Sequence, residues 1–355
     1  MRTVHVVVPG GIDDPARPSG GNVYDRRICD GLAALGWGVH EHAVDGGWPW
    51  PDADACRALD HVIAKLPDGA VVLIDGLIAS TVPAVLVPHA HRLVLVVVVH
   101  LPLGDGPPGH EVANAHSREC AVLAAATSIV TTSEWTRDLL LDRYPLLPNK
   151  VVVAEPGTDR AAVAPGTEDG GQLLCVAAVT PHKGHDVLLA ALAAVRDLSW
   201  HCVLVGTLER VRDFADLLQH RAEEAGIGDR ISFAGPRTGA ELDRAYAAAD
   251  LLVVPSLGET YGMVVAEALA RGLPVIATAV GGLPHTLGCT TDGRRPGLLV
   301  EPGDAPALAA ALSGWLRDAE LRRSLRLAAR MRRETLSDWA STVERIAQIL
   351  TEAAL

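Results

Sequence analysis

The chain has 355 residues, more than one ordinary hydrophobic core holds, and predicts two domains of roughly 150 to 180 residues each. Its formal net charge of −12 argues against nucleic acid or a broadly anionic membrane surface as the main partner. The six cysteines are scattered without a CxxC pair, which is typical of reduced thiols in a cytoplasmic enzyme. Every apolar run is far shorter than the ~20 residues that span a bilayer, so we expect at most peripheral membrane contact.

The first predicted element is an apolar strand at Val4–Val8. A polar loop follows that ends at Ser19-Gly20-Gly21, and a helix is predicted over Val23–Leu35. A strand, a glycine-rich loop and a helix bring backbone N–H groups close to a phosphate or a substrate. The loop lacks the GxGxxG spacing of a dinucleotide site, so turn chemistry would explain the Gly20-Gly21 pair equally well.

Further buried strands are predicted at 39–43, 71–74, 93–98, 128–131 and 151–153, with helical stretches between them. This alternation indicates a parallel, doubly wound α/β sheet. Ligands of such sheets bind beyond the carboxyl ends of the strands, and His100 stands at the end of a central strand. His100 is therefore a candidate active-site residue, although a hydrogen-bonded histidine that closes a strand is an equal alternative.

The segment 155–171, rich in proline, glycine and acidic residues, predicts a linker. Strand and helix alternation restarts at Leu173–Val176, which predicts a second α/β domain. The loop after this strand places Lys183 beside a helix start, where a lysine opposes the helix dipole unless an anion binds both. The last segment, Trp339–Leu355, has apolar residues on one helical face and predicts a helix that covers a core.

The stretch 255–282, PSLGETYGMVVAEALARGLPVIATAVGG, predicts a loop, a helix that begins near Gly262 and a second buried strand. Glu259 belongs to the loop and Glu267 to the helix, and the N–H groups of Gly262, Met263 and Val264 lie between them. N–H groups at a helix start bind anions, and carboxylates beside them suit the hydroxyls of a sugar that carries a diphosphate. The alternative is that Glu259 favours the helix dipole and Glu267 lies on a solvated helix face.

This block resembles the donor-binding block of family 4 retaining glycosyltransferases, which have the two-domain GT-B architecture. The resemblance extends over most of the chain, and its motifs are Ser19-Gly20-Gly21, His100, Lys183-Gly184, Pro255-Ser256, Glu259 to Val264, Glu267-Ala268 and Gly281-Gly282. It implies two Rossmann-like α/β domains that face a central cleft. Residues 1–165 would bind the acceptor, residues 166–335 would bind the nucleotide sugar, and residues 336–355 would form a helix that packs back on the first domain.

The resemblance also implies roles for the candidate residues. Glu259 would contact the hydroxyls of the donor sugar, and Glu267 would hold the ribose. The diphosphate would be bound by Lys183 and by the N–H groups of the helix start, which are those of Gly262, Met263 and Val264. In the first domain, His100 would face the sugar near the reacting carbon, and Gly21, beside Gly20, would approach the phosphate and the acceptor.

The expected activity is transfer of a hexose from a nucleotide diphosphate sugar to a hydroxyl acceptor, either a small molecule or a lipid. No carboxylate is clearly placed as a covalent nucleophile, and the resemblance implies same-face substitution assisted by the leaving phosphate, with no metal and no cofactor. Where the family often has an arginine, this chain has Ala177 and Ala178, and His285 replaces an acid that follows the Gly-Gly-x-Pro turn. The alternatives are a non-catalytic sugar-nucleotide-binding subunit and a sugar-nucleotide epimerase on the same fold.

Overall fold

The computed structural model describes residues 2–105 and 110–355, and the chain divides into two compact units. The first unit comprises Met1–Asp13, Ser19–Gly157 and Trp339–Leu355, and the second comprises Asp14–Pro18 and Thr158–Asp338. The division at 157/158 lies inside the predicted linker. Among the described residues, no helix is both long and apolar enough to cross a membrane.

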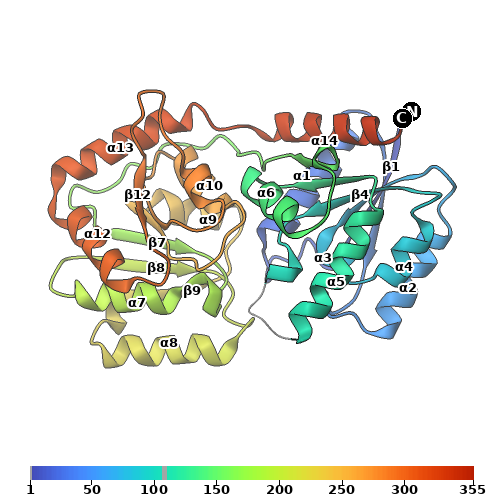
Figure 1. Cartoon of the computed structure of the whole chain (residues 1–355). Coiled ribbons are helices and arrows are strands. Elements are labelled where there is room, and N and C mark those ends of the chain that lie inside the picture. Colours follow the sequence, from blue (N-terminus) through green and yellow to red (C-terminus); the bar gives the residue numbers. More distant parts are fainter. Residues whose placement is uncertain (1, 106–109) are drawn as a thin grey trace. The chain divides into compact units, whose positions relative to one another are not determined.

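The first unit is built on a six-stranded sheet whose paired strands are all parallel (Figure 1). Its order is β2-β1-β3-β4-β5-β6. The strands are β1 Thr3–Pro9, β2 Gly38–Val44, β3 Val71–Asp75, β4 Val94–Val99, β5 Ser128–Thr131 and β6 Val151–Val153. Each strand that the sequence predicted in this unit is present. Continuous Val, Ile and Leu runs explain the central strands β3 and β4, which are buried on both faces, whereas β2 is a half-exposed edge strand.

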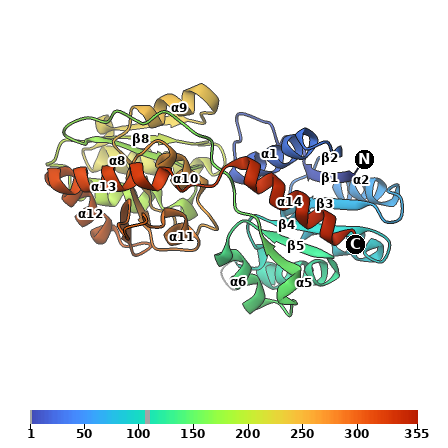
Figure 2. The ribbon, with the colours of Figure 1, turned by 90° about the horizontal axis from the view of Figure 1, so that it is seen from above.

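Helices cover both faces of this sheet. They are α1 Gly20–Ala34, α2 Ala53–Ala64, α3 Gly76–Ala79, α4 Pro83–Leu86, α5 His110–Ala125, α6 Glu134–Arg143 and α14 Trp339–Ala353. Val4 and Val6 pack with the apolar faces of α1 and α14, whereas Val7 packs on the other face with residues of α2. The last helix lies over this sheet, as Figure 2 shows, with Val343 and Ile346 buried beneath it. The prediction that α14 covers a core is confirmed.

The second unit has a six-stranded parallel sheet of order β12-β11-β10-β7-β8-β9. Its strands are β7 Gln172–Val176, β8 His201–Val205, β9 Ile231–Gly235, β10 Leu251–Val254, β11 Val275–Thr278 and β12 Gly297–Val300. Its helices are α7 His185–Ala194, α8 Arg212–Glu224, α9 Gly239–Ala247, α10 Met263–Ala270, α11 Leu283–Leu287, α12 Ala305–Arg317 and α13 Ala319–Arg333. Two aliphatic cores, one on each face, hold the sheet between helices.

Each sheet contains a point at which the chain reverses its direction of winding. In the first sheet this point lies between β1 and β3, and in the second it lies between β7 and β10. Ligands of open α/β sheets bind beyond the carboxyl ends of the strands at such a point. The fold therefore indicates two places to examine, the loops after β1, β3 and β4 and the loops after β7 and β10.

One expectation about the first of these loops is wrong. The sequence placed Gly20 and Gly21 in a loop before a helix that starts at Val23, whereas they are the first two residues of α1. The reason is the cap, because the hydroxyl of Ser19 accepts a hydrogen bond from the N–H of Asn22 over 3.1 Å and starts the helix early.

Candidate functional site

Three loops of the second unit meet at the carboxyl ends of β7, β10 and β11. The loop after β10 is bonded to both of the others through its backbone. The N–H of Leu257 donates to the carbonyl of His182 at 2.8 Å, and the N–H of Gly282 donates to the carbonyl of Glu259 at 2.9 Å. The loop that carries Glu259 is thus fixed from two sides.

Two glycines allow this close approach. Gly184 has φ +67°, and a Cβ there would lie 2.0 Å from the carbonyl oxygen of Pro255. Gly281 has φ +58°, and a Cβ there would lie 1.8 Å from the carbonyl oxygen of Glu259. Both positions require a left-handed backbone and leave no room for a side chain. The three loops therefore pack backbone against backbone, which holds the side chains of the site in place.

The ammonium of Lys183 and the carboxylate of Glu259 form an ion pair, with Nζ 2.7 Å from Oε2. The two side chains are 22% and 18% exposed, so the pair is partly buried. The sequence reasoning assigned these residues separate ligand groups and did not foresee their contact. A lysine has three N–H donors and a carboxylate about four acceptor sites, so each partner keeps capacity for a ligand.

Helix α10 begins immediately beside this pair. Its cap is Gly262 at φ +86°, without a capping hydrogen bond from a side chain, and the N–H of Val265 donates to the carbonyl of Gly262. The first N–H groups of a helix have no partner within that helix, which leaves those of Gly262, Met263 and Val264 for a ligand. A cation and a helix start together favour a phosphate.

Glu267 lies on the first turns of α10 and is held by a residue of α9. Its Oε2 accepts a hydrogen bond of 2.7 Å from the hydroxyl of Tyr246, and the guanidinium of Arg271 lies 4.6 Å from the centroid of the Tyr246 ring. Burial raises the pKa of Glu267, while the hydrogen bond and Arg271 oppose that rise. The alternative of a solvated helix face is wrong for Glu267, because this carboxylate has a fixed partner.

In the first unit, a second cluster joins residues from two strand ends and from helix α1. The ring Nε2 of His100, just after β4, lies 2.8 Å from Oδ1 of Asp25 on α1. Asp75 at the end of β3 lies close by, since ligand atoms of all three residues lie within 4.8 Å of one another. A Cβ on Gly21 would lie 3.3 Å from Cδ2 of His100. His100 is thus hydrogen-bonded and also stands at the expected edge of the sheet.

Within this second cluster, neighbouring charges shift the pKa values of His100 and Asp75. Burial alone would lower the pKa of His100, but the charge of Asp25, the hydrogen bond to it and the charge of Asp75 raise it to about 9. Burial and the charge of Asp25 raise the pKa of Asp75 to about 7. Two carboxylates and an imidazole are also the side-chain types that bind divalent cations. Within residues 2–105 and 110–355, these three are the set whose oxygen and nitrogen atoms lie close enough together to bind one cation.

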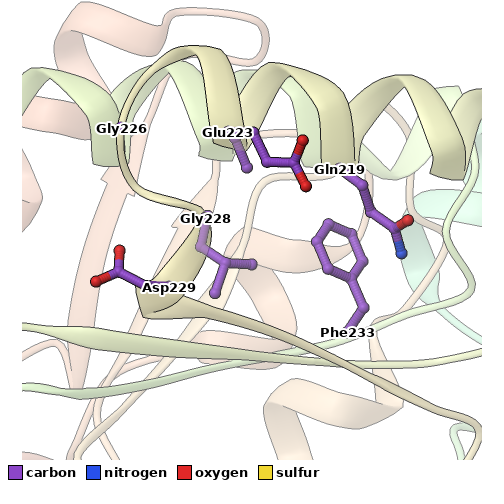
Figure 3. A pocket seen from close by; sticks show the side chains of 8 residues that line it. Gln219, Glu223, Gly226, Gly228, Asp229 and Phe233 are labelled. Carbon is purple, nitrogen blue, oxygen red and sulfur yellow. The ribbon is translucent and has the colours of Figure 1, made fainter.

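A hollow of about 500 Å³ lies elsewhere in the second unit, between the end of α8 and the start of β9 (Figure 3). Its wall includes Gln219, Glu223, Asp229 and Phe233. Because β9 begins at Ile231, the hollow lies at the amino end of this strand. Ligands of open sheets bind at the opposite edge, where Lys183 and Glu259 lie, so the hollow is not part of the candidate site.

Comparison with known proteins gives the family. Residues 161–332 match the model described as Glycosyl transferases group 1. D-inositol 3-phosphate glycosyltransferase 1 of Catenulispora acidiphila is 31% identical over 299 residues, which cover 79% of this chain and 69% of that protein. The chain belongs to the group 1 glycosyl transferases. A second relative is the D-inositol 3-phosphate glycosyltransferase of Salinispora arenicola. It is 34% identical over 293 residues, which cover 76% of this chain and 63% of that protein. The chain thus spans less than two thirds of that second relative.

Solved structures confirm the fold of this group 1 transferase. Sucrose-phosphate synthase from Thermosynechococcus elongatus has a TM-score of 0.81 at 23% identity, with 99% of both chains covered. HepE from Anabaena, in complex with UDP and glucose, has a TM-score of 0.76 at 16% identity, with 99% of this chain and 100% of that chain covered. At these identities the likeness shows the fold alone, and it confirms the predicted GT-B architecture.

The structure brings most of the predicted site residues together in two groups. Lys183, Glu259 and the start of α10 gather in the second unit, with Glu267 further along the same helix, while Gly20, Gly21 and His100 lie in the first. The sequence reasoning missed three partners, which are Asp25, Asp75 and Tyr246. Only Asp25 left a signal, because it lies four residues after Gly21 and hence on the same face of α1.

Proposed function

We propose that the chain is a retaining glycosyltransferase that moves a hexose from a nucleoside diphosphate sugar to a hydroxyl acceptor. The observation that carries this proposal is the Lys183–Glu259 pair beside the start of α10, at the point where the second sheet reverses its winding. Cation, carboxylate and helix N–H groups are the ligands that a sugar diphosphate requires. Membership of the group 1 glycosyl transferases supports the same activity.

In the proposed reaction, the bond between the anomeric carbon and the phosphate oxygen breaks, and its electron pair goes to the diphosphate. Lys183 and the N–H groups of Gly262, Met263 and Val264 stabilise this negative charge. Glu259 accepts hydrogen bonds from sugar hydroxyls, and Glu267 accepts them from the ribose. The acceptor oxygen bonds to the anomeric carbon on the face that the phosphate leaves, and its proton passes to a phosphate oxygen. Because Lys183 and these N–H groups would neutralise the diphosphate, we propose that the reaction needs no metal ion.

The acceptor class is open to direct test. The curated relatives are named D-inositol 3-phosphate glycosyltransferases, so a phosphorylated polyol is the first acceptor to try, with lipid acceptors second. Ala177 and Ala178 leave the anion site without the arginine that the family resemblance led us to expect, which favours a non-catalytic sugar-nucleotide binder as the second candidate. The cytoplasmic location stays a prediction from the cysteine pattern.

The test incubates the protein with UDP-, GDP- and ADP-hexoses, with and without inositol phosphate, and measures release of the nucleoside diphosphate. Acceptor-dependent release and a product that keeps the donor's anomeric configuration by NMR are expected. Glu259→Gln should reduce release by about 100-fold or more, since it removes the charge but not the shape of the residue. Donor turnover without any acceptor would indicate an epimerase, and binding without release would indicate a binder.

A further inference from the structure

The histidine at the end of β4 belongs to a group of three titratable residues. We call Asp25, Asp75 and His100 the Asp–His cluster. Asp25 lies on α1, the helix that connects β1 to β2, Asp75 ends β3 and His100 follows β4, so the cluster lies beside the point where the first sheet reverses its winding. Both carboxyl-bearing residues are 6% exposed. Burying two carboxylates is costly in free energy unless positive charge or hydrogen bonds lie beside them.

The contacts show what is compensated and what is not. Asp75 accepts a hydrogen bond of 2.8 Å from the N–H of Leu77, which begins α3. Asp25 bonds His100 through Oδ1, whereas its buried Oδ2 has no hydrogen-bond partner in the described parts of the chain. A buried carboxylate oxygen of this kind is strongly unfavourable unless a positive charge lies beside it. The imidazole of His100, bonded to the other oxygen of the same carboxylate, supplies this charge when it is protonated. A hydrogen bond from the protonated carboxyl of Asp75 to Asp25 contributes to the raised pKa of Asp75.

The orientation of the His100 ring is also fixed. The Tyr24 ring meets it edge-on with 5.2 Å between centroids, and the backbone of Gly21 lies so close that even a Cβ would touch the imidazole. The hydroxyl of Tyr24 donates to the carbonyl of Ala154 at 3.0 Å. Of the groups around the ring, the carboxylates of Asp25 and Asp75 are therefore the ones that set its charge.

We propose that Asp25 is a positioning residue that keeps His100 protonated and fixed, so that His100 acts as a cation and hydrogen-bond donor at the end of β4. With Nε2 bonded to Asp25, a protonated ring offers Nδ1–H to its surroundings and cannot accept a proton from the acceptor hydroxyl. This inference rests on the proposed transferase function, and it leaves the departing phosphate as the base of the reaction. The raised pKa of His100, about 9, agrees with the geometry.

The first test is an NMR titration of histidine-labelled protein, with the His100 signal assigned by its loss in His100→Gln. In the unaltered protein His100 should titrate near 9, and in Asp25→Asn it should titrate at or below the ordinary 6.5, because burial then outweighs the remaining charge of Asp75. Asp75→Asn should give a smaller shift, because Asp75 acts through charge alone. Asp30→Asn, an exposed carboxylate on the same helix, is the matched control and should change nothing.

A His100 that titrates at or below 6.5 in the unaltered protein would overturn the proposal, and so would an unchanged titration in Asp25→Asn. Should Asp25→Asn fail to fold, Asp25→Glu and Asp75→Asn test the proposal instead. Asp25→Glu should keep the pKa of His100 high, and Asp75→Asn should lower it. ZnCl₂ or MgCl₂ should leave the His100 signal in place, since a saturable shift would show a metal site instead. None of these readouts needs turnover, so they hold or fail separately from the proposed function.

The second test is the pH profile of hexose transfer. In Asp25→Asn the alkaline limb of kcat should move to lower pH by the shift that the titration measures, with KM for the donor unchanged. A merely structural role would lower kcat at every pH without moving the limb, and this outcome would refute the assignment. Asp25→Glu should restore most of the alkaline limb.

Discussion

The hydroxyl of Tyr246 and the carboxylate of Glu267 are joined by a hydrogen bond of 2.7 Å between α9 and α10. We expect Tyr246→Phe to weaken nucleoside diphosphate binding by about tenfold, because the carboxylate that would hold the ribose loses its fixed donor, a change of about 1.4 kcal/mol. The loss should grow at acidic pH, since this hydrogen bond opposes the rise in the pKa of Glu267 that burial causes. Calorimetry against UDP, GDP and ADP measures both effects.

Tyr144→Phe is the matched control for this prediction. Tyr144 donates to the buried carboxylate of Glu119 over 2.5 Å, the same chemistry in the first unit. It should reduce stability and leave the affinity for nucleoside diphosphates unchanged. Equal affinities of Tyr246→Phe and the unaltered protein would contradict the role of Glu267 in holding the nucleotide.

The ion pair of Lys183 and Glu259 predicts strong coupling between two substitutions. Lys183→Met or Glu259→Gln alone leaves a partly buried charge without its partner, whereas the double variant leaves none. We expect the double variant to regain about 1 to 2 kcal/mol relative to the sum of the single losses while activity stays low. Urea denaturation gives the free energies of unfolding, and release of nucleoside diphosphate gives the activity.

The exposed pair of Arg212 and Glu209 on the same unit provides the control. Its side chains are 63% and 70% exposed, so the corresponding cycle should give coupling close to zero. Coupling at Lys183 and Glu259 no larger than this would show that the two charges act independently.

Much of the architecture could be predicted because it depends on local sequence patterns. Apolar runs predicted the strands of the first unit, and β7 and β11 in the second, and alternation with helices predicted two parallel sheets. The start of α1 was misplaced by three residues because the capping bond of Ser19 outweighed the low helix propensity of Gly20 and Gly21. Strand β12 was not predicted, because it lies in a stretch with no distinctive period.

The site was predictable only to the level of motifs. Residue types and spacing indicated Lys183, Glu259 and His100 individually, but not the bonds that they make. The partners Lys183 and Glu259 are 76 positions apart, and Asp25 and His100 are 75 apart. Contacts at such separations follow from strand order and loop geometry, which periodicity does not contain.

The histidines of β1 and β2 predict a loss of stability in acid. The Nδ1 of His5 lies 3.1 Å from Nε2 of His42, and the rings of His5 and His40 stack with 5.0 Å between centroids. Burial and then repulsion within the group lower the pKa values of His5 and His42 below 6.5. Because the unfolded chain binds protons more readily, stability is complete above about pH 6.5 and falls as pH decreases below it.

Urea midpoints at about pH 8 and about pH 5 measure this effect. His5→Gln and His42→Gln should each reduce the difference between the two midpoints. His220→Gln, at an exposed position on α8, is the control and should leave the difference as it is. A difference that persists undiminished in both variants would place the acid-sensitive groups elsewhere.

The contact of α1 with α14 is close enough to be tested by one methyl group. A Cβ on Gly31 would lie 2.3 Å from Cγ2 of Val343, and both helices belong to the first unit. Overpacking of this kind typically costs about 1 to 3 kcal/mol, and alanine regains about 1 kcal/mol of helix propensity. We therefore expect Gly31→Ala to destabilise by about 1 to 2 kcal/mol. In α12 a Cβ on Gly314 would lie 3.7 Å from Leu321, so Gly314→Ala should stabilise instead.

A size-compensating partner makes this prediction specific. Val343→Ala alone leaves a cavity, but in Gly31→Ala/Val343→Ala the new methyl group occupies the space that the valine methyls leave. The double variant should therefore be more stable than the sum of the two single losses, as measured by the free energy of unfolding. Strict additivity of the two losses would mean that α14 does not pack on α1 through these residues.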